Sequence, residues 1–165
     1  MSDIVVDTNV WVMVDKKVSE LEENEDRNCV RSCQVWLERF IIGEDRLVVD
    51  SFNTYAIISE YRRNVMPGGI AENLLNELVT VLFDRLLQLE IQLDENGYAE
   101  LPNQLMSLHG KDRKFVAVAI QCVPYAPIVN ATDTDWAQEK QQLADTGVTV
   151  QELCPEYIEA KLSRA

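Results

Sequence analysis

The amino-acid sequence predicts an α/β protein, a three-layer α/β/α sandwich with a mainly parallel central sheet. Short β-rich apolar runs occur at residues 4–6, 47–49 and 128–131, which is the pattern of strands buried on both faces of a sheet. Segments with helical periodicity separate these runs. Strands that alternate with helices favour a parallel sheet with crossover helices. A length of 165 residues, of which 47% are hydrophobic, predicts one domain over residues 1–165.

The first half of the chain contains two of these strands. After the strand at 4–6, apolar side chains at helical spacing predict a helix over 28–42, which Gly43 ends. After the strand at 47–49, Asp50 or Ser51 caps a helix that runs to about residue 64. A Pro-Gly-Gly break follows at 67–69. An aliphatic stripe along 70–89 then predicts one long helix.

The second half of the chain continues the alternation. Residues 90–93 alternate polar and apolar side chains, which favours a short edge strand before the Asn96-Gly97 turn. A helix is predicted over 112–122, a third buried strand over 128–131, and a further helix over 135–144. Residues 148–153 predict the final strand, and a small amphipathic helix follows Pro155.

The charge of the chain is strongly acidic, with a formal net charge of −13. This weighs against tight nucleic-acid binding, because phosphate contacts depend on Lys and Arg. Five of the acids fall within residues 20–26, which is typical of a solvated loop or helix end. No apolar run reaches the roughly 20 residues that a membrane helix needs. The N-terminus also lacks the pattern of a signal peptide, so we expect a cytoplasmic protein without membrane partners.

The four cysteines have no Cys-x-x-Cys spacing, and His109 is the only histidine. A zinc site would therefore need most of these scattered residues to converge. Cys29 and Cys33 are four residues apart and can share one helix face. We expect buried free thiols in a reducing compartment.

Four carboxylates from distant parts of the chain lie near the ends of predicted strands or in the helices beside them: Asp7, Glu60, Asp112 and Asp133. Ligands of open parallel sheets bind beyond the carboxyl ends of the strands. Carboxylates gathered there repel one another unless a cation lies between them. Oxygen ligands without cysteine or histidine suit Mg²⁺ or Mn²⁺. The sequence therefore predicts a metal site formed by these acids.

Each of these acids also has a simpler interpretation. An Asp after a strand is often a turn or cap residue. Asp112 at a helix start can complement the helix dipole. Glu60 can be a surface residue paired with Arg63 or Asn64, and Asp133 or Asp135 can cap the helix that follows.

Four short motifs resemble those of the PIN domain family. Residues 4–10 (IVVDTNV) look like its N-terminal signature, a hydrophobic strand that ends in Asp-Thr-Asn or Asp-Thr-Ser. Glu60 in 57–62 (IISEYR) matches the glutamate after the second strand of the family. Residues 111–119 (KDRKFVAVA) are similar to its third acidic motif, and 131–136 (ATDTDW) resemble its closing Thr-x-Asp-x-Asp-Phe motif, with Trp136 replacing Phe. Their order and spacing agree from residue 4 to about residue 153.

The resemblance implies a metal-dependent endoribonuclease that hydrolyses RNA phosphodiester bonds with a metal-activated water. The catalytic residues that it implies are Asp7, Glu60, Asp112 and Asp133. Asp7, Asp112 and Asp133 would hold Mg²⁺ or Mn²⁺, and Glu60 would bind the metal directly or through water. Asp135 would replace or assist Asp133 as a metal ligand.

Supporting residues and partners are also implied by the resemblance. Thr8 and Thr132 would orient the carboxylates through their hydroxyl groups, and Asn9 would brace the loop. Many small members of the family are toxins of bacterial toxin–antitoxin pairs and form homodimers. An RNA substrate, an antitoxin protein and a second copy of the chain are therefore the implied partners.

A basic cluster flanks Asp112, with Lys111, Arg113 and Lys114 close to His109. It is either a rim that contacts substrate phosphates or a solvated helix start, and both interpretations stay open. Tryptophans at 11, 36 and 136 can stack on bases or fill the core, and Trp36 is assigned to the core.

Two other functions compete with the nuclease. A degenerate PIN-like module would bind a partner without cleaving it, which the acidic composition favours. A metal-dependent phosphatase of the haloacid dehalogenase type also begins with an Asp after its first strand. That class needs a second Asp two residues later, where this chain has Asn9.

Overall fold

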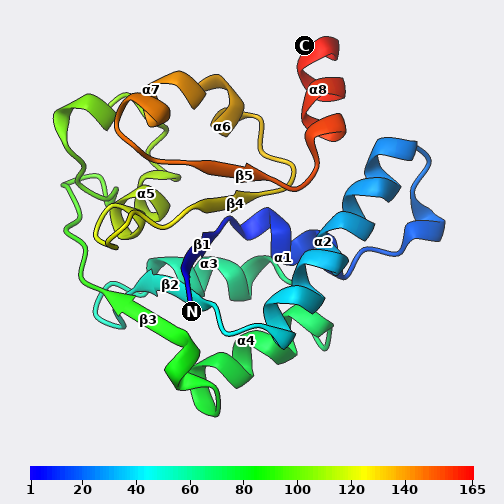
Figure 1. The fold of residues 1–165 in the computed structure, drawn as a ribbon, viewed down its shortest axis with the longest axis horizontal. Coiled ribbons are helices and arrows are strands. Elements are labelled where there is room, and N and C mark those ends of the chain that lie inside the picture. The colour runs from blue at the N-terminus through cyan, green and yellow to red at the C-terminus, as the bar shows by residue number, and fades with distance from the viewer.

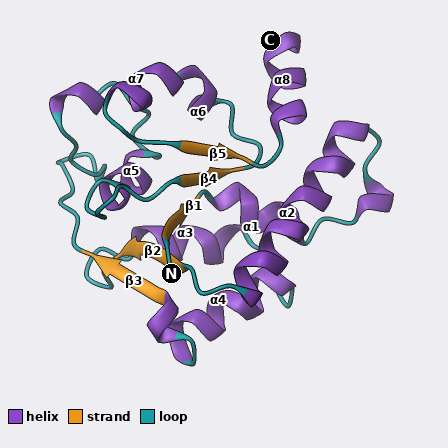
Figure 2. Cartoon of the chain, viewed as in Figure 1, coloured by secondary structure: helices purple, strands orange, loops and turns teal.

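The computed structural model describes residues 1–165 and contains one five-stranded sheet in which every pairing is parallel. The strand order is β3-β2-β1-β4-β5 (Figure 1). The strands are β1 (Asp3–Val6), β2 (Arg46–Asp50), β3 (Leu86–Leu89), β4 (Ile128–Asn130) and β5 (Val150–Glu152). Helices lie on both sides of the sheet (Figure 2). The predicted three-layer α/β/α architecture with a parallel sheet is therefore confirmed.

The central strand β1 pairs with β2 on one side and with β4 on the other. Asp3 is opposite Arg46, and Val5 is opposite Ile128. Val5 and Val6 are fully buried, as are the side chains of β4. This burial on both faces explains why residues 4–6 of the first strand are all apolar.

Eight α-helices and three short 3₁₀ helices connect and cover the strands. The helix α5 packs against β1, β2 and β4, and α2 packs against α1 and α8. The α-helices are α1 (Thr8–Val14), α2 (Asn24–Ile42), α3 (Ala56–Asn64), α4 (Ile70–Thr80), α5 (Arg113–Ala119), α6 (Asp135–Gln138), α7 (Lys140–Asp145) and α8 (Pro155–Arg164). The 3₁₀ helices are η1 (Val18–Glu20), η2 (Phe83–Arg85) and η3 (Asn103–Leu105).

The long helix expected over 70–89 is wrong in its second half. The helix α4 ends at Thr80, and the turn η2 leads into strand β3. Leu86 to Leu89 pair with Leu47 to Asp50 of β2, so the backbone of this segment is satisfied by a neighbouring strand. An aliphatic stripe cannot distinguish a helix from a strand that pairs with a distant segment.

The edge strand expected over 90–93 is also wrong, because β3 itself is the edge strand and it ends at Leu89. Leu93 forms only one antiparallel bridge, to Ala99. Gly97 lies between these residues with a φ of 79°, which only a residue without Cβ adopts at little cost. The predicted turn is therefore present, but the strand is not.

Several boundaries differ from the expectation. The helix over 135–144 divides at Glu139 into α6 and α7, and a helix α1 directly after β1 was not expected. Neither of the two proposed caps stands at the N-cap position of α3, which is Tyr55, but Asp50 still binds the first turn of the helix. Its buried carboxylate accepts hydrogen bonds from the backbone N–H groups of Ala56 at 2.7 Å and Ile57 at 2.8 Å.

The expectation of four free thiols is wrong for two of the cysteines. Cys29 on α2 and Cys154 before α8 form a disulfide, with Cα atoms 5.0 Å apart. Cys33 and Cys122 are free and buried, as expected. A pairing across 125 residues leaves no local pattern, and only the packing of α2 against α8 reveals it.

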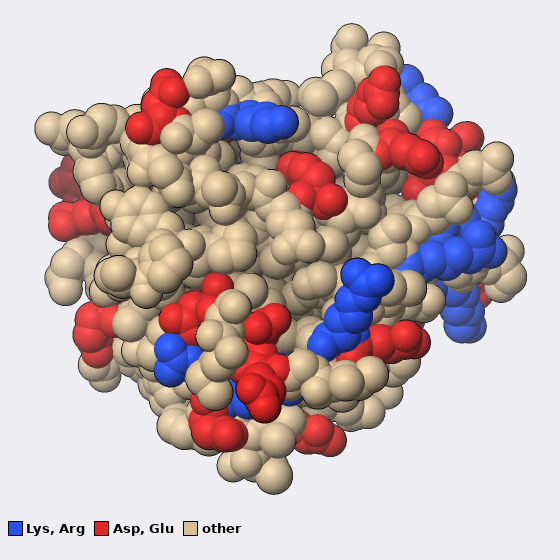
Figure 3. Space-filling model, viewed as in Figure 1, with Lys and Arg blue, Asp and Glu red and all other residues tan.

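The surface in Figure 3 carries acidic side chains in several groups. Basic side chains are fewer in this view and lie mainly on the side where α2 runs. None of the helices has the length and apolar character that a bilayer span requires.

Candidate functional site

The candidate site is a cleft of about 730 Å³ beyond the carboxyl ends of β1 and β4. These neighbouring strands form the point where the strand order reverses, since β2 follows on one side of β1 and β4 lies on the other. Ligands of open α/β sheets bind at such a point. The structure brings all four predicted acids into this cleft: Asp7, Glu60, Asp112 and Asp133.

Asp7 is the most deeply buried of the four acids, with 5% of its surface exposed. The indole Nε1–H of Trp136 donates to its Oδ2 at 2.5 Å, and its Oδ1 accepts no hydrogen bond. Burial, and then the nearby charges of Asp133, Asp112 and Glu60, raise the pKa of Asp7 to about 7. Only the Trp136 hydrogen bond acts in the opposite direction. The site therefore holds an unneutralised carboxylate at its centre.

Asp112 precedes α5 but makes no side-chain cap hydrogen bond. Its pKa is raised to about 7, first by burial and then by the charge of Asp133, while Lys114 lowers it. A carboxylate that only complemented a helix dipole would have a lowered pKa. This shift favours the site interpretation of Asp112 over the simpler one.

Asp133 follows β4, and its carboxylate makes one hydrogen bond. Its Oδ1 accepts the backbone N–H of Asp135 at 2.9 Å, which supports the first turn of α6. Burial raises the pKa of Asp133, although this hydrogen bond lowers it. Asp133 therefore caps the turn and still lines the cleft.

Glu60 on α3 is already paired within the protein. Thr8 donates its hydroxyl to Oε1 at 2.5 Å, and the Lys114 ammonium lies 2.6 Å from Oε2. The simpler interpretation, a surface pair with Arg63 or Asn64, is wrong: Asn64 contacts only the Glu60 backbone carbonyl. Because both oxygens of Glu60 are occupied, it is the least available of the four acids to bind a metal directly.

Asn9 braces the loop after β4, as expected. Its Oδ1 accepts the backbone N–H groups of Ala131 at 2.9 Å and Thr132 at 3.2 Å. The expectation for Thr132 is wrong, because its hydroxyl makes no hydrogen bond to a carboxylate and only its backbone participates. Thr8 orients Glu60 rather than a central aspartate.

Two residues that the sequence analysis missed extend this network. Asn130, which is fully buried at the end of β4, accepts a hydrogen bond from the Asn9 side chain at 3.1 Å. Its own amide donates to Glu152 of β5 at 2.7 Å and to the backbone carbonyl of Asp133 at 2.9 Å. Burial raises the pKa of Glu152. The sequence does contain a signal for Asn130, because it is the one polar residue in the otherwise apolar run at 128–131.

The predicted basic rim is largely wrong. Lys114 is buried against Glu60, and Arg113 donates to the backbone carbonyls of Met106 and Leu108. Of the proposed phosphate contacts only Lys111 lines the cleft. Lys16 and Arg63, which the sequence analysis did not select, are exposed on the cleft wall and form no ion pair.

Asp135 faces a neighbouring pocket of about 190 Å³ rather than the main cleft. There its carboxylate, the Asp112 carboxylate and the His109 ring have ligand atoms within 4.8 Å of one another. The basic cluster expected to flank Asp112 therefore contributes one histidine, His109, beside the acids. Asp112 lines both pockets, so it is the residue that connects them.

The tryptophans belong to the core. Trp11 and Trp136 are almost fully buried, and Trp36 is partly buried and packs against the core. Trp11 and Trp36 lie edge to face with their ring centroids 5.7 Å apart. Base stacking on Trp11 or Trp136 is excluded by this burial.

The acids of the main cleft fit a hard divalent cation. The free Oδ1 of Asp7 and the carboxylates of Asp112 and Asp133 offer oxygen donors, which Mg²⁺ and Mn²⁺ prefer. Burial first, and then the neighbouring acids, raise the pKa values of Asp7 and Asp112 to about 7, so a positive partner among them would relieve the repulsion. Lys114 does not supply this positive partner for Asp7, because the Lys114 ammonium is paired with Glu60.

Comparisons with known proteins find no relative of this chain. No family model, no curated protein and no solved structure matches it significantly. The functional argument therefore depends on the residues of the cleft.

Proposed function

We propose that the chain is a Mg²⁺- or Mn²⁺-dependent endoribonuclease of the PIN type. The observation that carries the proposal is the burial of Asp7 at the reversal point of the sheet, in one cleft with Asp112 and Asp133. Buried like charges without a counter-charge are costly, and they persist where they bind a cation.

In this proposal Asp7, Asp112 and Asp133 hold the cation, and Glu60 binds it through water. The bound metal ion supplies an activated water and stabilises the charge that develops on the phosphate. Trp136 fixes Oδ2 of Asp7 so that Oδ1 points to the cation site. Thr8 and Lys114 fix Glu60, and Asn9 and Asn130 fix the loop that carries Asp133.

The substrate contacts in this proposal are Lys16, Arg63 and Lys111. All three are exposed on the cleft wall, on α3 or in the segments after α1 and before α5, where they can bind phosphates on both sides of the reacting one. Tyr157 of α8 lines the same cleft with the Lys161 ammonium 5.1 Å from its ring centroid, so an unpaired base would stack on the rest of the ring. Single-stranded RNA is therefore the proposed substrate class. An antitoxin partner and a homodimer are supported only by the family resemblance.

The decisive experiment is cleavage of labelled single-stranded RNA in Mn²⁺, Mg²⁺ or EDTA by the wild type, Asp7→Asn and Asp84→Asn. Asp84 is an exposed acid on η2, far from the cleft lining, and serves as the matched control. We expect cleavage to require the metal ion and Asp7→Asn to reduce its rate at least about 100-fold. A residue that only supports a metal ligand costs up to about 100-fold when it is altered, and a direct ligand should cost at least as much. Equal rates in wild type and Asp7→Asn would contradict the proposal.

A second candidate function is metal-dependent binding without cleavage. The net charge of −13 and the neutralisation of Glu60 by Lys114 favour it. If Mn²⁺ raises the melting temperature of the wild type but not of Asp7→Asn, and no RNA is cleaved, the binding function is supported and the nuclease is not.

A further inference from the structure

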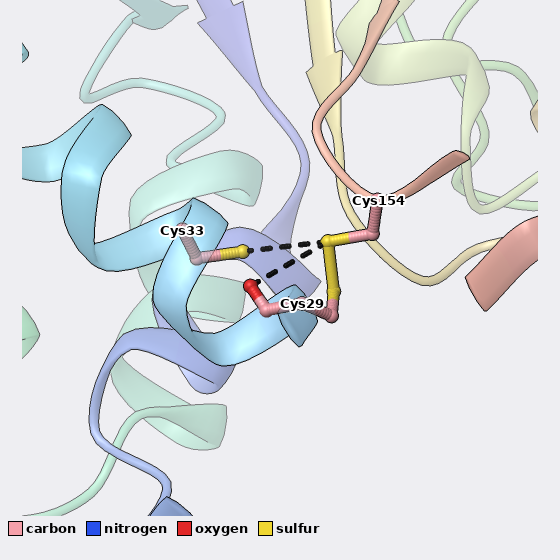
Figure 4. Close-up of side chains that lie close together, drawn as sticks. All are labelled: Cys29, Cys33 and Cys154. Carbon is pink, nitrogen blue, oxygen red and sulfur yellow. Dashed lines mark hydrogen bonds between the residues drawn. A yellow bond between two sulfur atoms is a disulfide. The ribbon is translucent and has the colours of Figure 1, made fainter. Parts of the chain in front are cut away.

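Three sulfur atoms gather on the side of the molecule where α2 meets α8, and none of the three cysteines lines the acidic cleft. Cys29 and Cys33 lie one turn apart on α2, and Cys154 precedes α8 (Figure 4). All three side chains are buried, and their sulfur atoms lie within 4.8 Å of one another. Cys29 and Cys154 are joined in a disulfide, and the Cys33 sulfur is 3.9 Å from that of Cys154.

The spacing of these sulfurs suits a metal–thiolate site. Zn²⁺–sulfur bonds are about 2.3 Å long, so two sulfurs of a tetrahedral site lie about 3.8 Å apart. The Cys33–Cys154 distance of 3.9 Å already matches this value. Opening the disulfide allows the Cys29 sulfur to move away from Cys154 to a similar separation.

We propose that the sulfurs of Cys29, Cys33 and Cys154 form a binding site for one thiophilic ion, of which Zn²⁺ is the type, when the disulfide is reduced. Soft thiolate ligands select ions of this class over Mg²⁺ and Mn²⁺. The site is therefore chemically distinct from the acidic cleft and does not depend on the proposed nuclease function. The disulfide and the metal site are alternative states of the same three residues.

The conversion between these states balances as a two-electron reduction. A dithiol reductant delivers two electrons and two protons to the Cys29–Cys154 bond and becomes a disulfide itself. The products are two thiols, which join the Cys33 thiol. Each thiol that ligates the ion releases its proton to solvent.

The surroundings of the sulfurs provide access and partial charge compensation. A pocket of about 480 Å³ borders Cys29 and Cys154, and it leaves room for a water molecule as the fourth ligand. Cys154 stands at the N-terminus of the ten-residue helix α8, where a thiolate is favoured.

Metal binding would preserve the connection that the disulfide makes. In both states α2 is tied to the start of α8, the helix that carries Tyr157 to the wall of the acidic cleft. Reduction without metal would leave α8 held by its packing and by exposed ion pairs of Arg164 with Glu23 and Glu25. The reduced protein should therefore be more stable with Zn²⁺ than without it.

The test uses the full chain, reduced with a phosphine. A thiol reductant is avoided because its own thiolate would compete with the cysteines for the ion. Cd²⁺ reports thiolate ligation through a sulfur-to-metal absorption band, and Zn²⁺ affinity is measured by competition with a chromophoric chelator. We expect one ion per reduced chain and none in the oxidised chain. Cys33→Ser should lower the Cd²⁺ band by about one third, because it removes one of three sulfurs, and weaken Zn²⁺ binding at least about 10-fold.

Cys122→Ser is the matched control, because Cys122 is also a buried free cysteine but lies outside the cluster. It should bind both ions as the wild type does, and so should Asp7→Asn, which separates this site from the acidic cleft. If Cys33→Ser does not fold, Cys33→Ala replaces it, with the circular dichroism spectrum as the criterion. Absence of the Cd²⁺ band in the reduced wild type, or an unchanged band in the Cys33 variant, would overturn the proposal.

Discussion

At the scale of single residues, Asp7 is the most deeply buried acid of the candidate site. Its pKa in the folded protein is about 7, while the ordinary value is 3.8. The folded state therefore holds a proton that the unfolded state has already lost. Its ionised form is disfavoured first by burial and then by the neighbouring acids.

This shift predicts the pH dependence of the metal-free protein. A raised pKa in the folded state contributes stability that is fully present below about pH 4 and is lost as the pH rises to about 7. For Asp7 alone the loss is about 1.4 kcal/mol for each pH unit between these values. Urea unfolding in EDTA across this range measures it, and Asp7→Asn should flatten the dependence. A variant with the same slope as the wild type would contradict the assignment.

At the scale of secondary-structure elements, the loops after the strands are held by polar side chains that replace missing backbone partners. Asp50 after β2 accepts the first N–H groups of α3, and Asn9 after β1 accepts those of the loop after β4. These contacts position Glu60 and Asp133, which the two segments carry. The geometry of the cleft therefore depends on how the loops are capped.

Replacing Asp50 should destabilise the protein and disturb the position of Glu60 in the cleft. Asp50→Ala leaves two buried N–H groups unpaired, which costs about 2 kcal/mol or more. The free energy of unfolding in urea is the measurement, and Asn53→Ala in the same loop, where the side chain is exposed, should change it little. Equal stability of the two variants would show that Asp50 does not hold the first turn of α3.

At the scale of the whole molecule, a net charge of −13 opposes the approach of any nucleic acid. Affinity for RNA must then come from a few local cations and from the metal site. Lys16, Arg63 and Lys111 are the cations on the cleft wall. The proposed nuclease would therefore bind its substrate weakly and depend on local contacts.

The salt dependence of RNA binding should be correspondingly shallow. Three phosphate contacts to a single strand predict a slope of about −2 in a plot of log affinity against log salt concentration. Lys111→Gln should reduce this slope by roughly one contact and raise KM with little change in kcat. Fluorescence anisotropy with a catalytically inactive Asp7→Asn background measures the slope. An unchanged slope in Lys111→Gln would exclude this residue as a phosphate contact.

Local sequence patterns were sufficient for most elements of the fold but not for all. The apolar runs at 4–6 and 47–49 predicted their strands, because a strand that is buried on both faces consists almost entirely of apolar residues. The aliphatic stripe at 70–89 predicted a single helix, which is wrong for residues 86–89, because these residues satisfy their backbone groups by pairing with β2. That pairing depends on a segment about 40 residues away, which no local window contains.

For the candidate site, the sequence by itself determined which acids gather at one edge of the sheet. Asp7 and Asp133 follow strands, Asp112 opens a helix, and Glu60 lies in the helix after β2. Only the tertiary structure decided how they are partnered. It paired Lys114 with Glu60, aimed Trp136 at Asp7, and placed His109 beside Asp135. It also joined Cys29 to Cys154. These contacts depend on side-chain direction and on long-range packing, which sequence spacing does not encode.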